Sequence, residues 1–300
     1  MIKKNISNKF YSNGILINPS KNEKMFNLNY NKIVSLFEEN GFILFRGFNI
    51  EDKEITKITD KYTYSYANDA IRREDYEGAQ QVRHVDPGNK EMGLHSEASF
   101  SPNWPEIIWF FCRDTNIKNN QGSTTFCDGI KLWDNLSHKV KDYFLSNPIK
   151  YNLEIPISNN KIGKGKKNWI LNYEGSGNCI LDLSKSKLFL TQTRFAAIHS
   201  RLPNKISFCN HLISSMREGT DPTIKGWSKV PKHILNEVYE KAEKLTYDIK
   251  WKKGDLVMID NKRFMHGRRK FDKKVKRSIL VVQSSLANFG YGSSTRKITN

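Results

Sequence analysis

The chain has 300 residues, of which 38% are hydrophobic and 12% aromatic, and its formal net charge is +18. This composition excludes a disordered tail, a coiled coil and a collagen-like chain, and no apolar run approaches the roughly 18 residues of a membrane helix. The basic excess leaves two interpretations open: codon usage in an AT-rich genome, or a surface suited to an acidic partner.

The cysteines and the first residues indicate a cytoplasmic protein. Four cysteines are widely spaced and form no Cys-x-x-Cys pattern: Cys112, Cys127, Cys179 and Cys209. Free thiols in a reducing compartment fit such spacing best. The opening stretch MIKKNISNKFYSNG has lysines but no apolar segment after them, so we expect no secretory signal. We also expect neither a membrane nor a nucleic acid as a partner, because the sequence contains no apolar span and no RNA-recognition or zinc-knuckle pattern.

The first elements along the chain are predicted to be a helix followed by a strand. Ile33, Leu36 and Phe37 have helical spacing, and Gly41 suits the position that ends a helix. The run FILFRGF at 42–48 predicts a strand, and a second helix is expected over 52–65. Residues 66–92 are polar and charged and predict a long loop, of a length typical of segments that cover a binding site.

From residue 106 onward the pattern is mainly β. Short apolar runs predict strands at 106–112, 121–127, 149–157, 168–173, 178–183, 188–195, 206–213, 246–251, 255–260 and 277–286. Helices are expected over 131–146 and 232–245. Many short strands with turn signals between them indicate an antiparallel sandwich or jelly roll with flanking helices, in one domain that spans 1–300. Strands and helices do not alternate as they would in a Rossmann fold or a TIM barrel.

A histidine and a carboxylate lie two residues apart in the segment GLHSEASFSPNWPE, residues 93–106. On a strand, His95 and Glu97 would point to the same face and supply two ligands for a divalent metal. By themselves they are weak evidence, since such pairs also occur as surface hydrogen bonds.

A second histidine follows an apolar strand in WKKGDLVMIDNKRFMHGRRKF, residues 251–271. His266 would complete a face of two histidines and one carboxylate, which leaves three neighbouring coordination positions open. The alternative for His266 alone is a hydrogen-bonded histidine of the core. Arg277 comes eleven residues later and opens the strand RSILVVQSSL. Its planar guanidinium could bind a carboxylate with two hydrogen bonds, and the alternative is a solvated strand arginine.

Four motifs in order resemble the taurine dioxygenase-like (TauD/TfdA) family of Fe(II)/2-oxoglutarate oxygenases. They are G-x-H-x-E, QGSTTFCDG, GD-x-x-x-x-DN-x-x-x-x-HGR and R-x-x-x-V, and the likeness runs from FRGF near residue 45 to about residue 285. The chain is most similar to the branch with Glu in the iron triad, which includes clavaminate synthase-like and syringomycin-pathway amino-acid hydroxylases. The family fold is the double-stranded β-helix, a jelly roll.

The resemblance implies roles for individual residues. His95, Glu97 and His266 would bind iron, and Arg277 would hold the C5 carboxylate of 2-oxoglutarate. Thr124 matches the threonine that helps to hold that carboxylate, with Thr125 as the rival one position away. Arg268 of the His-Gly-Arg segment is a further candidate for binding the co-substrate, as the alternative to Arg277. The chain departs from the taurine-oxidising member at Val281, where that member has a second arginine.

The resemblance implies that the protein oxidises a small molecule with Fe(II), 2-oxoglutarate and O₂ and releases succinate and CO₂. The leading expectation is hydroxylation of an unactivated C–H bond in an amino acid or its derivative, free or tethered to an acidic carrier protein, in a secondary-metabolite pathway. Glu97 argues against halogenation, because related halogenases have a small residue there. The alternatives are a dioxygenase for a sulfonate or another small anionic acid, and a non-catalytic basic jelly-roll binding protein. Desaturation or cyclisation in place of hydroxylation, and the oligomeric state, stay open.

The loop at 66–92 lies where the family has a segment that covers the substrate. Its candidate anchors for an anionic group are Arg72, Arg73, Gln80, Gln81 and Arg83, and further along the chain Arg194 and Arg217. Each could instead be an exposed polar residue. The aromatic run Trp109, Phe110 and Phe111 could line the pocket, although burial in the core is the better expectation.

Overall fold

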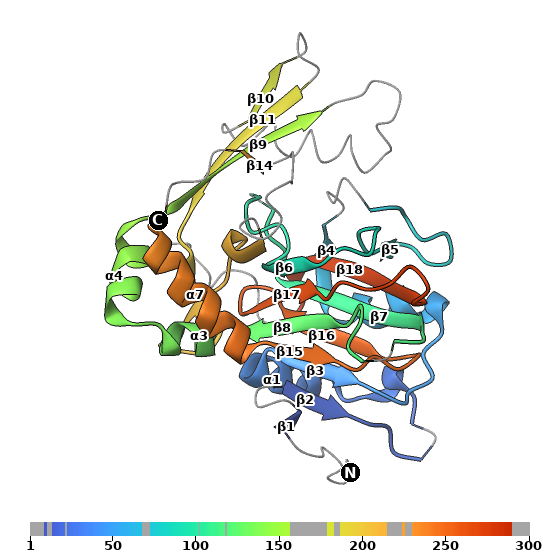
Figure 1. Cartoon of the computed structure of the whole chain (residues 1–300). Coiled ribbons are helices and arrows are strands. Elements are labelled where there is room, and N and C mark those ends of the chain that lie inside the picture. Colours follow the sequence, from blue (N-terminus) through green and yellow to red (C-terminus); the bar gives the residue numbers. More distant parts are fainter. Residues whose placement is uncertain are drawn as a thin grey trace.

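Two β-sheets face each other across an apolar interior, as expected for a jelly roll, and two larger apolar clusters lie on their outer faces beneath the helices. The computed structural model describes residues 9–10, 14–21, 23–67, 73–101, 103–117, 119–156, 179–182, 187–214, 224–225 and 230–289. The fold is mainly β with few helices, and the prediction of a double-stranded β-helix is confirmed (Figure 1).

The larger sheet has the strand order β1-β2-β3-β16-β7-β18-β4, and β5 also pairs with β18. Its strands are β1 (Lys9–Phe10), β2 (Gly14–Ile17), β3 (Phe42–Phe45), β4 (Thr63–Tyr66), β5 (Arg83–His84), β7 (Ile107–Thr115), β16 (Leu256–Asp260) and β18 (Arg277–Ala287). All its pairings are antiparallel except that of β2 with β3. The long strands β7 and β18 therefore lie side by side although more than 150 residues separate them in the sequence.

The smaller sheet carries most of the residues that matter for function. Its order is β15-β8-β17-β6, with β6 (Met92–His95), β8 (Thr124–Asp128), β15 (Tyr247–Ile249) and β17 (Phe264–Arg268). Phe126 of this sheet and Phe42 of the larger sheet stack edge to face, with ring centroids 5.1 Å apart. Contacts of this kind close the interior between the two sheets.

Side chains of β7 alternate between two apolar clusters, because successive residues of a strand point to opposite faces. Phe110 points into the interior between the sheets. Trp109 and Phe111 point to the other face of the larger sheet. All three are buried, so the expectation that this aromatic run belongs to the core is confirmed.

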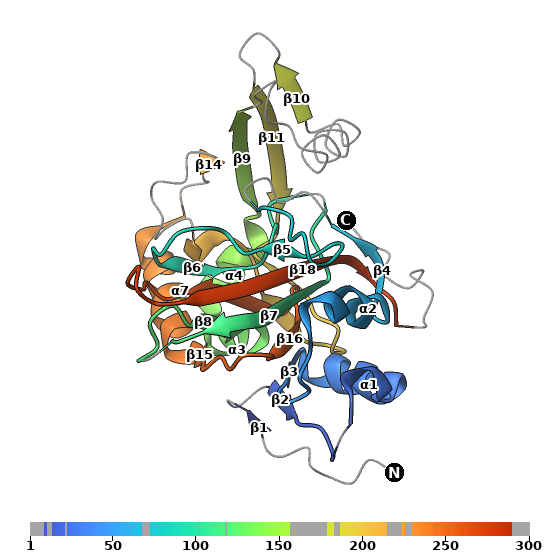
Figure 2. The same ribbon diagram turned by 90° about the vertical axis from the view of Figure 1, so that its right-hand side faces the viewer.

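Helices cover the outer faces of both sheets (Figure 2). On the larger sheet lie α1 (Tyr30–Asn40) and α2 (Ile55–Asp60), preceded by the short 3-10 helices η1 (Met25–Asn27) and η2 (Asp52–Glu54). On the smaller sheet lie α3 (Gly129–Asn135), α4 (His138–Ser146) and α7 (Lys232–Leu245). The first helix ends as expected, because Gly41 has the positive φ of 69° that glycine adopts without strain. Within the described residues, no helix combines the length and the apolar character needed to span a membrane.

A third sheet projects from the body of the molecule at the top of Figures 1 and 2. Its order is β10-β11-β9-β14, with β9 (Ile149–Pro156), β10 (Cys179–Asp182), β11 (Lys187–Arg194) and β14 (Ile224–Lys225). A hairpin of β12 (Ala197–His199) and β13 (Ile206–Phe208) lies between β11 and β14 in the chain. The strand expected at 168–173 lies outside the described residues.

Several predicted boundaries were wrong. The helix expected over 52–65 ends at Asp60, and β4 begins three residues later because Thr63 pairs with Ala287 of β18. The helix expected over 131–146 consists of two helices, since Ser137 caps the start of the second one. The segment 66–92 is not all loop, because β5 pairs with β18. Three of the four cysteines, Cys112, Cys127 and Cys209, are free and buried, as expected.

Candidate active site

Two histidines far apart in sequence lie opposite each other at one edge of the smaller sheet. His95 is the last residue of β6, and it pairs with His266 in the middle of β17. Their ring centroids are 4.6 Å apart. His266 was expected just beyond the strand at 255–260, but it lies on the next strand, β17. Antiparallel pairing of β17 with β6 places it beside His95.

Glu97 reaches the same place from a turn and not from the strand. β6 ends at His95, and Glu97 opens the turn that follows, so the prediction that both lie on one strand was wrong. Asn261, fully buried in the turn between β16 and β17, holds this turn in place. Its Oδ1 accepts a hydrogen bond from the Glu97 amide nitrogen at 2.9 Å, and its Nδ2 donates to the Glu97 carbonyl oxygen at 3.0 Å and to the Pro105 carbonyl oxygen at 2.9 Å.

Asn261 is a positioning residue that sequence reasoning did not single out. It stands in the Asp-Asn pair of the motif GD-x-x-x-x-DN, and that pattern was its only signal. Ser96 strengthens the same link, since its Oγ donates to the carbonyl oxygen of Asn261 at 2.6 Å. The loop after β16 thereby fixes the backbone on both sides of the Glu97 side chain.

The three side chains form a set that could hold a metal ion. One donor atom from each of His95, Glu97 and His266 lies within 4.8 Å of the others. The Glu97 Oε2 and His266 Nε2 atoms are 3.7 Å apart, which is too long for a hydrogen bond. The Nδ1 of His95 lies 2.9 Å from the carbonyl oxygen of Gly93. Because a carbonyl can only accept, Nδ1 carries the proton and Nε2 keeps its lone pair for a ligand.

The surroundings of these groups suit metal binding. The Nδ1 atom of His266 is buried and has no hydrogen-bond partner among the described residues. Burial and the neighbouring His95 lower the pKa of His266 to about 4, so this imidazole is neutral at pH 7. Burial by itself would raise the pKa of Glu97, but Arg73 and the two histidines outweigh it and hold that pKa well below its usual value. Two imidazoles and one carboxylate form the donor set of a non-haem Fe(II) site, and these residues fit it.

Arg277 lies at the start of β18 and has no acidic partner among the described residues. Its Nε donates to the carbonyl oxygen of Gly122 at 2.7 Å, and its Nη2 donates to Thr124 Oγ1 at 3.1 Å. Trp251 Nε1 donates to the same hydroxyl oxygen at 2.9 Å, which fixes the rotamer of Thr124. Thr124, and not Thr125, is therefore the threonine that contacts Arg277.

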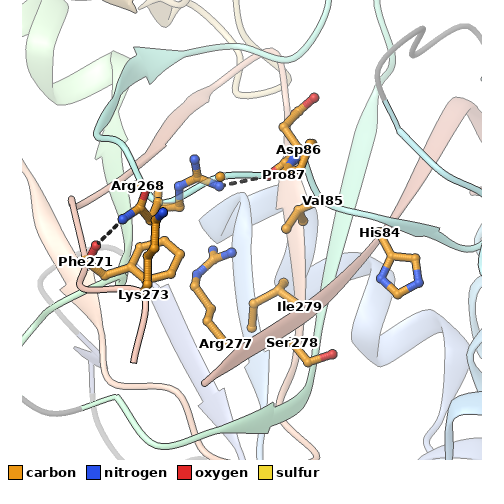
Figure 3. A pocket seen from close by; sticks show the side chains of 12 residues that line it. His84, Val85, Asp86, Pro87, Arg268, Phe271, Lys273, Arg277, Ser278 and Ile279 are labelled. Carbon is orange, nitrogen blue, oxygen red and sulfur yellow. Dashed lines mark hydrogen bonds between the residues drawn. The ribbon is translucent and has the colours of Figure 1, made fainter. Parts of the chain in front are cut away.

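Arg268 and Arg277 line one pocket of about 380 Å³ between β18 and the segment 84–89 (Figure 3). Desolvation and the charge of Arg268 lower the pKa of Arg277 to about 9. Arg268 donates to the carbonyl oxygen of Asp86 at 2.8 Å and to that of Lys90. The pocket thus holds two guanidinium groups and the further cation Lys273, so it favours an anion.

Val281 occupies the position of the second arginine of the taurine-oxidising relative, and it does not line the pocket. Val281 is 2% exposed and belongs to the apolar interior between the sheets. Arg268 supplies a second guanidinium from a different strand.

Among the described candidate anchors for a substrate, Arg73 alone contacts a residue of the metal set. Its Nη2 lies 2.6 Å from Glu97 Oε2 and 3.0 Å from Asp86 Oδ2. Arg83 pairs with Asp75, and Arg194 donates to the carbonyl oxygen of Ser101. The main-chain oxygen of Gln80 accepts from Thr56, and Gln81 has a positive φ of 62° in a turn. Arg72 and Arg217 lie outside the described residues.

Comparison with known proteins places the chain in a family. Residues 17–283 match the model of the family described as taurine catabolism dioxygenase TauD, TfdA family. The chain belongs to this family, and it is an Fe(II)- and 2-oxoglutarate-dependent dioxygenase.

Solved structures show the same fold at low sequence identity. One is PvcB, described as an Fe, alpha-ketoglutarate dependent oxygenase from an isonitrile synthetic pathway; it has a TM-score of 0.56 and 16% identity over 90% of this chain and 85% of its own. Another structure of PvcB, from Pseudomonas aeruginosa, has a TM-score of 0.57 and 14% identity over the same shares. A third is AAD-2 in complex with Mn(II) and N-oxalylglycine, with a TM-score of 0.59 and 14% identity over 94% of this chain and 96% of its own.

Proposed function

We propose that the protein hydroxylates an unactivated C–H bond of an amino acid or an amino-acid derivative in a secondary-metabolite pathway. The observation that carries this proposal is the metal set His95, Glu97 and His266 close to a pocket lined by Arg277, which has no acidic partner among the described residues. The triad with Glu, and not Asp, supports membership of the branch of clavaminate synthase-like and syringomycin-pathway hydroxylases.

In this proposal the two histidines and Glu97 hold Fe(II). The metal, when bound, supplies the reduction of O₂ that is coupled to decarboxylation of 2-oxoglutarate and oxidation of the substrate. The protein contributes the arrangement of the ligands. The hydrogen bond from His95 Nδ1 to Gly93 orients one ring, and Asn261 fixes the turn that carries Glu97. A carboxylate at position 97 fills the ligand position that halogenation needs for chloride.

Arg277 and Thr124 are the residues we assign to the distal carboxylate of 2-oxoglutarate. Arg277 has no counter-ion among the described residues, and the hydroxyl of Thr124 is aligned on it by Trp251. Arg268 contributes a second positive charge on the other side of the pocket. The one carboxylate in the lining, Asp86, is paired with Arg73, so a dicarboxylate would supply the negative charge that Arg277 lacks.

The nature of the substrate draws support from two observations. PvcB, which shares the fold, is named for an isonitrile synthetic pathway, a biosynthetic and not a catabolic setting. The net charge of +18 would suit docking of an acidic carrier protein that presents a tethered substrate. We propose a cytoplasmic enzyme on the basis of its free, buried cysteines.

The test is release of succinate from 2-oxoglutarate by protein reconstituted anaerobically with Fe(II) and then exposed to O₂. The panel contains the free L-amino acids and small sulfonates such as taurine. Stimulation by one amino acid, with a product heavier by one oxygen atom in mass spectrometry, is the expected result. Stimulation by a sulfonate alone would replace the amino acid with the sulfonate as substrate. Failure of the protein to bind either Fe(II) or 2-oxoglutarate would refute the assigned site and favour a non-catalytic binding protein.

A further inference from the structure

Arg73 has one buried guanidinium nitrogen that none of the described residues satisfies. The side chain is 5% exposed, and its Nε and Nη2 atoms both donate to the same oxygen, Asp86 Oδ2, at 3.2 and 3.0 Å. The Nη2 atom also donates to Glu97 Oε2. The remaining nitrogen, Nη1, is buried and has no hydrogen-bond partner in the part of the chain that the structure describes. A buried, unpaired N–H group of a cation is costly, so its presence points to a ligand that accepts from it.

Asp86, the partner of Arg73 in this pair, also has a carboxylate oxygen that is available to a ligand. The Oδ1 atom of Asp86 has no hydrogen-bond partner among the described residues, and the side chain is 25% exposed. The pair therefore presents one donor atom, Arg73 Nη1, and one acceptor atom, Asp86 Oδ1, next to Glu97. Because Nε and Nη2 face Asp86, Nη1 lies on the opposite side of the guanidinium, and a ligand that binds both atoms has to extend along the pair. Asp86 is held from the other side as well, because its carbonyl oxygen accepts from Arg268 at 2.8 Å.

Arg73 and Asp86 flank a segment that is held together by hydrogen bonds. The amide of Tyr76 donates to the Val82 carbonyl oxygen and the amide of His84 donates to the Glu74 carbonyl oxygen, both at 2.9 Å. Asp75 forms an isolated β-bridge with Arg83, which also pairs with it through a salt bridge at 3.0 Å. These contacts close residues 74–84 into a hairpin, so Arg73 and Asp86 are brought together at its two ends.

The ionised groups of this pair suit a ligand that carries both charges. Arg73 is a cation that can bind a carboxylate, and Asp86 has a carboxylate oxygen that can bind an ammonium group. A free amino acid carries both groups and adds no net charge to the site.

We propose that Arg73 and Asp86 bind the α-carboxylate and the α-ammonium groups of a free amino acid. The inference rests on the proposed function and deepens it, because a carboxylate bound by Arg73 has to be free. In a carrier-tethered aminoacyl thioester the same carboxyl carbon is bonded to sulfur and carries no charge. The pair thus selects the free amino acid over the tethered one. Arg73 lies 2.6 Å from Glu97, so the side chain of the bound amino acid starts beside the metal set.

The experiment measures binding and not turnover. The protein is loaded anaerobically with Fe(II) and 2-oxoglutarate, and the visible charge-transfer band of that complex is recorded during titration with each of the twenty L-amino acids. The amino acid that shifts the band is then compared with its methyl ester and with taurine. We expect the methyl ester to bind at least 30-fold more weakly, because it cannot form a charge-assisted pair with Arg73.

Four variants assign the effect to residues. Arg73→Gln and Asp86→Asn should each raise the dissociation constant of the amino acid at least 30-fold, with that of 2-oxoglutarate changed by less than threefold. Arg73→Lys should keep part of the affinity for the amino acid, since lysine keeps the positive charge but lacks the planar guanidinium with its several donors. The matched control is Arg113→Gln. Arg113 also pairs with an aspartate, Asp52, at 2.8 Å, but its side chain is 48% exposed and lies outside the pocket. This variant should bind both ligands like the wild type.

Each contrary result has a separate meaning. Equal binding of the amino acid and its methyl ester would overturn the inference even if Arg73→Gln did not fold. Loss of Fe(II) or 2-oxoglutarate binding in Arg73→Gln, with amino-acid affinity retained, would reduce Arg73 to a positioning residue for Glu97. Binding of 2-oxoglutarate without a response to any amino acid would overturn the inference and leave the oxygenase activity standing. Only a wild-type protein that binds neither Fe(II) nor 2-oxoglutarate would refute the proposed function itself.

Discussion

Replacement of Arg277 by glutamine should weaken co-substrate binding strongly and change the stability of the ligand-free protein very little. The guanidinium of Arg277 has no acidic partner among the described residues and lies in the same pocket as Arg268. Its charge therefore disfavours the folded protein when no anion is bound. Glutamine removes the charge but keeps an amide that can donate a hydrogen bond.

The size of the stability effect follows from the pKa of Arg277. A fall from 12.5 to about 9 corresponds to about 5 kcal/mol against the charged form, at about 1.4 kcal/mol for each pH unit. Water in the pocket screens part of this, so we take about half, or roughly 2.5 kcal/mol. The variant also loses the hydrogen bonds from this charged group to Gly122 and Thr124, at about 1.5 to 3 kcal/mol each, and the glutamine amide can replace one of them. The gain and the remaining loss are of similar size, so the stability of the metal-free variant should lie within roughly 1 kcal/mol of that of the wild type.

The effect on the affinity for 2-oxoglutarate is much larger than the effect on stability. A hydrogen bond to a charged group contributes about 1.5 to 3 kcal/mol, and the planar fork can form two of them with one carboxylate. Loss of at least 3 kcal/mol would raise the dissociation constant by a factor of about 150. Thr124 would remain, but it is a neutral donor and cannot replace the charge.

Urea unfolding of the protein without ligands and titration of the charge-transfer band with 2-oxoglutarate measure the two effects. A variant that is clearly less stable than the wild type would show that Arg277 is satisfied by the protein alone. An unchanged affinity for 2-oxoglutarate would show that the distal carboxylate binds elsewhere. Either result would refute the reasoning, and Arg269→Gln, which removes a partly exposed arginine paired with Asp248, is the matched control.

Three further predictions concern the metal set. His266→Ala should abolish Fe(II) binding in equilibrium dialysis, and retained binding would exclude His266 as a ligand. Asn261→Ala should lower the free energy of unfolding by about 2 to 4 kcal/mol, because it leaves the buried polar backbone of Glu97 unpaired, and it should also weaken Fe(II) binding. The pKa of His266, lowered from 6.5 to about 4, means that the unfolded chain binds more protons than the folded one between these values. The metal-free protein should thus lose up to about 3 kcal/mol of stability as pH falls from 6.5 to 4, and this part of the loss should be absent in His266→Gln.

The sequence predicted those features that depend on local patterns. Alternation of apolar residues revealed most strands, and the residues His95, Glu97, His266 and Arg277 were selected by their types and their order. Their convergence could be predicted only through the resemblance to a family, because 171 residues separate the two histidines and no local rule relates them.

Features that depend on long-range contacts could not be predicted from the sequence. Glu97 leaves the strand because Asn261, from a distant turn, binds its backbone on both sides. The strand that carries His266 is short and contains Gly267 and two charged or polar positions, so its composition gave a weak β pattern. Arg73 was one of several equivalent candidates, and only its contacts with Glu97 and Asp86 distinguish it.

The position of β6 at the edge of the smaller sheet has a consequence for how long a metal would stay bound. β6 has one neighbouring strand in this sheet, and the register shifts between His266 and Arg268, so only two residue pairs define the ladder. An edge strand with so few pairs should open locally far more often than the whole protein unfolds. We expect the amides of residues 92–97 to exchange with solvent faster than those of β7 in the metal-free protein, and to slow when a divalent cation links β6 to β17. The residence time of the metal would then be set by opening of this strand and not by unfolding of the jelly roll.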